Sequence, residues 1–153
     1  MTHIRVELTA LQKQRIEDTK HTGSQLEKVH QIVQQFLDHQ KEGAWEGRAV
    51  FVPFQAQYTN VDKRARILYV LVNDTDQTIH GVSGSLLLKL PVKEAQVAAS
   101  KLSFTEEFMG RVAPQTAMMF FIDAPVKGLY QDQTFHLQTL QLYIKDIEFQ
   151  SVQ

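Results

Sequence analysis

The spacing of apolar residues along the chain changes near Gly43. Between Leu26 and Leu37 they recur every three or four positions, which is the period of one face of an α-helix. After Gly43 and almost to the C-terminus they recur every second position, which is the period of a β-strand with one buried face. The pattern predicts an N-terminal helical arm over residues 1–43, packed on a β-domain over residues 44–153, as a single folding unit.

Two helices are expected before Gly43. A weakly amphipathic helix should begin near Ala10, and the Thr-Gly-Ser sequence at 22–24 should interrupt it. Ser24 and Glu27 then have the spacing of a capping box, in which each residue satisfies a free backbone N–H of the first turn. The second helix is therefore expected from Ser24 to about Gly43, where a glycine is a natural stop.

The second helix has a stripe of apolar residues on one face. Its members are Leu26, Val29, Val33 and Phe36. Each large apolar side chain is stabilised by about 1.5–3 kcal/mol when it leaves water, so the stripe should contact a protein surface. That surface is either the β-domain of the same chain, which we favour, or a protein partner or second copy of the chain.

The region after Gly43 contains about six or seven short predicted strands without helical crossovers, which favours an antiparallel immunoglobulin-like β-sandwich. Residues 67–72 are apolar on both faces and should form a central strand. Pro53, Gly81 and Gly84 mark expected bulges or edge positions. The phase of the apolar residues slips twice within 134–149, which predicts bulges or two strands that share a bend.

The strongest apolar strands supply the expected core. Its members are Ile67, Tyr69, Leu71, Leu87, Phe104 and Phe120. Two polar segments should turn the chain: 73–77, which is rich in Asn and Asp, and 125–128, which begins with Pro and ends with Gly.

Composition excludes several function classes. The 153 residues carry a net charge of −1, which gives no electrostatic basis for binding nucleic acid or an anionic membrane. There is no cysteine, so disulfides, thiol catalysis and cysteine-based metal sites are excluded. The chain begins without the apolar run of a secretory signal and contains no run long enough to cross a bilayer. We expect a cytoplasmic protein without a transmembrane segment.

No pattern of catalytic or metal-ligating residues stands out. Among the six histidines, His21, His30 and His39 are nine residues apart, or about two and a half helical turns, so neighbours would face opposite sides. The small residues at 81–85 fit neither a nucleophile elbow nor a phosphate loop. The acids at 74–76 lack the glycine and the distant glutamate of a calcium loop. We expect no enzyme activity, no cofactor and no metal.

One stretch resembles a known family. From residue 67 the chain runs through an apolar strand, an Asn73-Asp74-Thr75 turn, a strand ending in Leu86-Leu87-Leu88, then Val97-Ala98-Ala99, Phe104, Met109-Gly110, Ala113-Pro114 and Phe120-Phe121. This order, over residues 67–123, resembles the SLAP domain, a module of Gram-positive bacteria linked by name to S-layer assembly and an accessory Sec secretion route. The resemblance implies a role peripheral to surface-protein export and brings no catalytic residue with it.

Two functions follow as hypotheses. The first is a non-catalytic interaction or assembly module, an accessory to surface-protein export, that binds a protein partner or itself. The alternative is a sandwich that binds a small ligand or carbohydrate, for which Trp45, Tyr58 and Tyr130 are the aromatic candidates. A flat apolar patch matching the helical stripe would favour the first, and a concave pocket lined by aromatic residues would favour the second.

Overall fold

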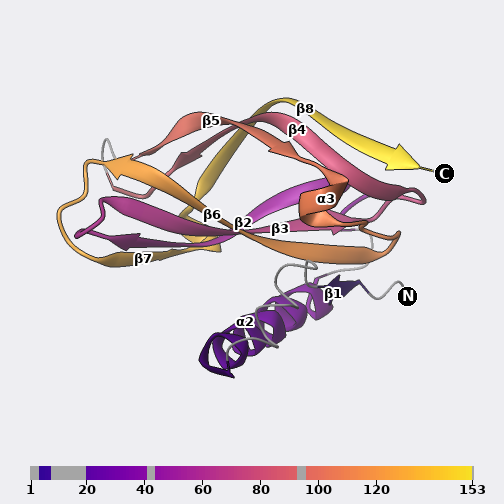
Figure 1. Cartoon of the computed structure of the whole chain (residues 1–153), viewed down its shortest axis with the longest axis horizontal. Coiled ribbons are helices and arrows are strands. Elements are labelled where there is room, and N and C mark those ends of the chain that lie inside the picture. The colour runs from indigo at the N-terminus through magenta and orange to yellow at the C-terminus, as the bar shows by residue number, and fades with distance from the viewer. Residues whose placement is uncertain (1–3, 8–19, 41–43, 93–95, 153) are drawn as a thin grey trace.

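The computed structural model describes residues 4–7, 20–40, 44–92 and 96–152, and the chain is mainly β with one long helix near the N-terminus (Figure 1). The elements in chain order are β1 (Arg5–Glu7), α2 (Lys20–Asp38), β2 (Ala49–Thr59), β3 (Arg64–Asn73), β4 (Thr78–Lys89), β5 (Gln96–Phe104), α3 (Glu106–Met109), β6 (Thr116–Lys127), β7 (Gln133–His136), the 3-10 turn η1 (Leu137–Thr139) and β8 (Gln141–Val152).

The strands form two sheets. Sheet A has the order β7-β2-β3-β6 with β1 beside β6, and sheet B has the order β5-β4-β8. The sheets join where the C-terminal end of β6 pairs with the start of β5, through Val126 with Val97 and Lys127 with Gln96. We call this join the seam. Every pairing is antiparallel except that of β1 with β6.

The predicted β-sandwich with a helix near its N-terminus is confirmed. An immunoglobulin-like strand order is not, because β7 pairs with β2 and β8 pairs with β4. In an immunoglobulin domain the last two strands lie together with the third.

The predicted central strand is also confirmed. β3 lies between β2 and β6, and its residues from Ile67 to Asn73 are all buried. Its inner face packs into the core between the two sheets, whereas its outer face packs into a second core beneath α2. A strand covered on both faces needs apolar residues at successive positions, which is why this segment does not alternate.

The predicted core is largely correct, with one wrong residue. Ile67, Tyr69, Leu71 and Phe120 are buried, and Phe104 is half-buried against the same core. Leu87 was expected inside, but the structure buries its neighbours Leu86 and Leu88, and Leu87 is only half-buried. In a run of three leucines every choice of phase leaves an apolar residue outside, so the sequence alone does not fix the register.

The predicted bulges fall where the register shifts. β2 slips against β3 between Pro53 and Gln55. β4 slips against β8 twice, just before Gly81 and across Gly84. A methyl group added at Gly84 would lie 2.9 Å from the Cα of Ile147, so the close approach of β8 requires glycine there. The two phase slips in 134–149 correspond to the η1 turn between β7 and β8 and to this bulge.

The turn after β3 is organised by Asn73, whose side chain is fully buried. Its Nδ2 donates to the carbonyls of Gln77 at 2.8 Å and Val112 at 2.9 Å. Its Oδ1 accepts hydrogen bonds from the backbone N–H of Thr75 at 3.1 Å and from the Thr75 hydroxyl at 2.6 Å. One amide thus ties the β3–β4 turn to the segment that leads into β6.

Three local predictions need correction. α2 runs without a break from Lys20, so the sequence at 22–24 does not interrupt it. The helix ends at Asp38 rather than Gly43, where the side chains of His39 and Gln40 bond to carbonyls of its last turn at 2.6 and 3.1 Å. β6 continues through Pro125, since proline fits a strand where a backbone N–H is not needed.

The start of the chain also contributes a strand to sheet A, because β1 pairs in parallel with β6. The apolar and polar residues at 4–8 alternate, as in a short strand. The helix expected from Ala10 lies outside the described residues.

Candidate functional site

The stripe on α2 faces the chain's own sheet (Figure 1). Val33 is fully buried, and Val29 and Phe36 are half-buried against the outer face of sheet A. The ring of Phe36 meets that of Phe54 edge to face, with centroids 5.4 Å apart. The side chain of Leu26 is not among the described ones. This apolar face is therefore covered by sheet A within one chain.

Polar contacts add to this packing. The amide of Gln34 accepts from the backbone N–H of Val6 and donates to the carbonyl of Ile4, both at 2.8 Å. His30 donates to the carbonyl of Val6 at 2.7 Å. These side chains supply the hydrogen bonds that a further strand would give to the outer edge of β1. α2 is thus held to sheet A by an edge contact as well as by its apolar face.

A cavity of about 350 Å³ opens at the seam, which we call the seam cavity. β5 and β6 pair at one end only and then diverge with their own sheets, as Figure 1 shows. The space between them reaches the inner faces of both sheets. Its lining residues are Ile67 and Tyr69 from β3, Leu86 and Leu88 from β4, Lys101, Ser103 and Phe104 from β5, and Ile122, Asp123, Ala124 and Pro125 from β6.

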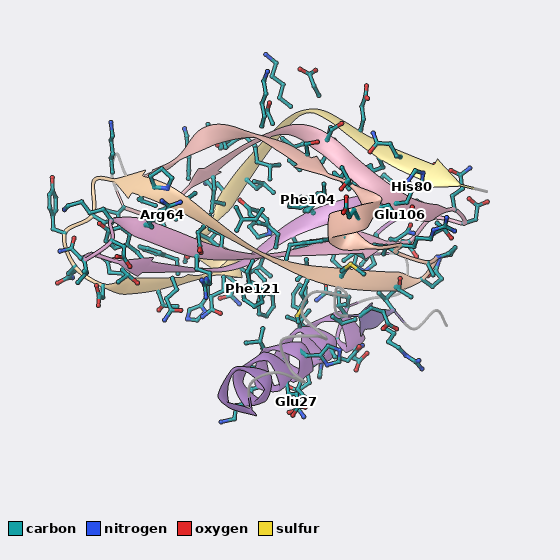
Figure 2. All side chains as sticks on the ribbon, in the orientation of Figure 1. Glu27, Arg64, His80, Phe104, Glu106 and Phe121 are labelled. Carbon is teal, nitrogen blue, oxygen red and sulfur yellow. The ribbon has the colours of Figure 1, made fainter. Side chains whose placement is uncertain are left out.

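The walls of the seam cavity are apolar and aromatic. In Figure 2, Phe104 lies between the sheets, and its ring stacks on that of Phe120 with centroids 4.9 Å apart. The charged residues of the lining, Lys101 and Asp123, are both exposed, so they belong to the mouth rather than to the interior. The cavity thus combines an apolar interior with a polar rim, which is the usual composition of a small-ligand site.

The carboxylate of Asp123 at the mouth is already engaged. Arg66 donates to both of its oxygens, at 2.9 and 3.2 Å. This hydrogen bonding lowers the pKa of Asp123, with a smaller contribution from the charges of Arg66 and Arg64, and it raises the pKa of Arg66. The fork of Arg66 therefore fixes the Asp123 carboxylate on the outer surface of sheet A.

Tyr69 places one polar atom in the apolar wall. The residue is 3% exposed, and its ring meets that of Phe51 edge to face at 6.2 Å between centroids. Among the described residues the Tyr58 hydroxyl has protein hydrogen-bond partners, whereas that of Tyr69 has none. Burial also raises the pKa of Tyr69, so the hydroxyl stays neutral.

The other buried tyrosine differs in this respect. Tyr58 is 1% exposed, and its one hydroxyl proton is shared between two acceptors, the carbonyl of Leu129 at 3.3 Å and Oδ1 of Asn60 at 3.2 Å. The Tyr69 oxygen is nevertheless not fully enclosed, since Oε1 of Gln115 is the one enclosed side-chain oxygen without a partner among the described residues. The Tyr69 oxygen therefore keeps some accessible surface, and Tyr69 is one of the residues that line the cavity.

The histidines are dispersed. His30 contacts β1 and His39 caps α2. His80 lies at the end of the sandwich near Glu106 of α3 (Figure 2), where the pKa of Glu106 is lowered mainly by its hydrogen bond from Arg111 and less by the charge of His80. Within the described ranges, no three His, Asp or Glu side chains gather to hold a metal. Nor does any described helix have the length and apolar character to cross a membrane.

The aromatic residues expected to bind a ligand do not meet at the cavity. Trp45 packs under α2, Tyr58 is in the core, and Tyr130 is 83% exposed. Tyr69 and Phe104 line the seam cavity instead, although their place in strongly apolar strands predicted only a core position.

Comparisons with known proteins identify no relative: no family model matches the chain, and neither a curated protein nor a solved structure resembles it significantly.

Proposed function

We propose that this protein is a non-catalytic binding protein that holds a small, mainly apolar ligand in the seam cavity. The observation that carries the proposal is an open cavity of about 350 Å³ with aromatic and aliphatic walls between two sheets. The volume lies within the range of small-molecule sites, toward its lower end. At about 30 Å³ per water-sized group, it has room for roughly a dozen non-hydrogen atoms.

Two further observations support a ligand over a protein partner. The apolar stripe of α2 packs on its own sheet, so the flat patch that would favour an assembly role is covered within one chain. The cavity, in contrast, is a concave space whose lining includes the aromatic residues Phe104 and Tyr69. A pocket that already exists loses little conformational entropy when a ligand enters it.

An interaction or assembly module is the second candidate. Its support is a surface on β8, where Tyr143 is 50% exposed and Ile144 is 40% exposed, on a strand whose described pairing is with β4 alone. Lys89 lies over the ring of Tyr143 at 5.3 Å. The resemblance to the SLAP domain adds the proposal that such a partner belongs to surface-protein export. The bulge near Asp146 and the charges of β8 weigh against simple strand addition.

Naphthalene is a suitable probe for the first proposal, because it is uncharged and about the size that the cavity holds. Amide chemical shifts measured during a naphthalene titration should change most at Lys101, Ser103 and Asp123, along the two strands of the mouth. Shifts concentrated instead at Tyr143 and Ile144 would favour the second candidate. The absence of any saturable shift would refute the proposed ligand site.

A cavity-filling variant gives the matched control. Ala124 lines the cavity. Ala65, the residue that pairs with it on the neighbouring strand β3, is also apolar and buried but does not line the cavity. Ala124→Leu should place its added carbons in the cavity, keep the fold and abolish the naphthalene shifts. Ala65→Leu has no such space and should destabilise the protein by about 1–3 kcal/mol. Retained binding by folded Ala124→Leu would contradict the assigned location.

A further inference from the structure

The hydroxyl of Tyr69 is an unusual feature of this core. Its neighbours on the inner face of β3 are Ile67 and Leu71, which are wholly apolar. A phenylalanine would give the same apolar packing, so the hydroxyl adds a polar atom to a side chain that lines the cavity. The fold satisfies the hydroxyl of Tyr58 from two sides, yet it leaves that of Tyr69 without a partner among the described residues while the side chain lines a cavity. A ligand that carries a polar group would offer this hydroxyl a hydrogen-bond partner.

The cavity also restricts the charge of what it holds. Tyr69 is the only ionisable residue among the described lining residues of the interior, and burial keeps it protonated and neutral. At the mouth, Asp123 is paired with Arg66, and Lys101 is exposed to water. An ionised group drawn inside would therefore be desolvated without a counter-charge, which is strongly unfavourable.

We propose that Tyr69 determines ligand specificity by hydrogen bonding to an uncharged ligand with a single polar group, an inference that rests on the proposed function. The ligand class is a compact ring system or short chain of roughly a dozen non-hydrogen atoms that carries one hydroxyl or carbonyl. The neutral phenol of Tyr69 can donate to a carbonyl and can either donate to or accept from a hydroxyl. The remaining contacts of the ligand are apolar.

Three probes of similar size test this assignment: naphthalene, 2-naphthol and 2-naphthoate. Their dissociation constants are measured by calorimetry or amide-shift titration on the wild type, on Tyr69→Phe and on the control Tyr58→Phe. The ratio of the naphthalene to the 2-naphthol constant measures selectivity for the polar group. This ratio should fall about five- to tenfold in Tyr69→Phe, which corresponds to one neutral hydrogen bond. In Tyr58→Phe the ratio should be unchanged.

Stability separates the two tyrosines independently. Tyr69→Phe should melt at the wild-type temperature or above it, because it removes an unpartnered hydroxyl, whereas Tyr58→Phe should melt lower because it loses made hydrogen bonds. An unchanged selectivity ratio in Tyr69→Phe would overturn the assignment while leaving the cavity as an apolar site. Preferential binding of 2-naphthoate, abolished by Lys101→Gln, would overturn it in favour of an anionic ligand. Failure of all three probes to bind the wild type would refute the proposed function itself.

Discussion

Replacement of Val33 by aspartate tests the packing of α2 most directly. Val33 is 0% exposed and packs against the outer face of sheet A, where its neighbours are apolar. Losing the burial of this side chain costs about 1.5–3 kcal/mol. The carboxylate then either remains buried without a partner or forces α2 off the sheet, which exposes Leu37 and the covered strands as well. We expect Val33→Asp to lower the free energy of unfolding by about 3–5 kcal/mol.

Ile32→Asp is the matched control. Ile32 precedes Val33 in the same helix but is 53% exposed. Both changes replace a β-branched residue by aspartate in the helix interior, so their effects on intrinsic helix propensity are similar. The difference between the two variants therefore measures burial, and Ile32→Asp should cost about 1 kcal/mol or less.

Urea unfolding followed by circular dichroism gives both values. With a slope of about 1–3 kcal/mol/M, the Val33→Asp midpoint should fall by roughly 2 M, and the Ile32→Asp midpoint should change little. Equal shifts in the two variants would refute packing of this face on sheet A. Wild-type stability in Val33→Asp, together with loss of self-association in light scattering, would mean that the stripe faces a second chain in solution. The double variant Val33→Asp with Phe36→Asp extends the same test to the half-buried end of the stripe.

Three further substitutions test the β-domain. Leu71→Ala in β3 should cost about 2–5 kcal/mol because the side chain is fully buried, and a loss below about 1 kcal/mol in urea unfolding would contradict its central position. Asn73→Asp removes the bonds that the Asn73 amide donates and places a carboxylate against carbonyls, so the melting temperature near pH 7 should fall and should recover at lower pH, where protonation restores a donor. A difference from the wild type that does not change with pH would contradict this. Gly84→Ala should destabilise the protein by at least about 1 kcal/mol more than Gly47→Ala, because only the first places a methyl group 2.9 Å from Ile147. Equal melting temperatures of the two variants would show that β8 moves away from the added methyl group at little cost.

Local chemistry in the sequence predicted much of the fold. The apolar stripe identified α2, the doubly apolar segment identified β3, and Asn73 with its polar neighbours identified a turn. Pro53 and Gly84 marked bulges because proline lacks a backbone donor and glycine lacks a side chain. Each of these features depends on residues that are close together along the chain, so a single sequence contains the information.

The register and the ends of elements depended on distant partners. Leu86 to Leu88 could have been buried in either phase, and the pairing of β4 with β5 and β8 decided that Leu87 faces outward. β6 continues past the proline at 125 because β3 pairs with it there. α2 continues through Gly23, because a glycine inside a helix costs only about 1 kcal/mol and is therefore a weak stop signal.

The candidate site was decided by tertiary structure alone. The seam cavity is lined from four strands between residues 67 and 125, and it exists because β5 and β6 pair at one end and then separate. The apolar run of β3 assigned Tyr69 to the core, which is correct. Such a run carries no information about whether the hydroxyl of a buried tyrosine finds a partner. That depends on which groups the two sheets bring within about 3 Å of the oxygen, and only the folded arrangement fixes those distances.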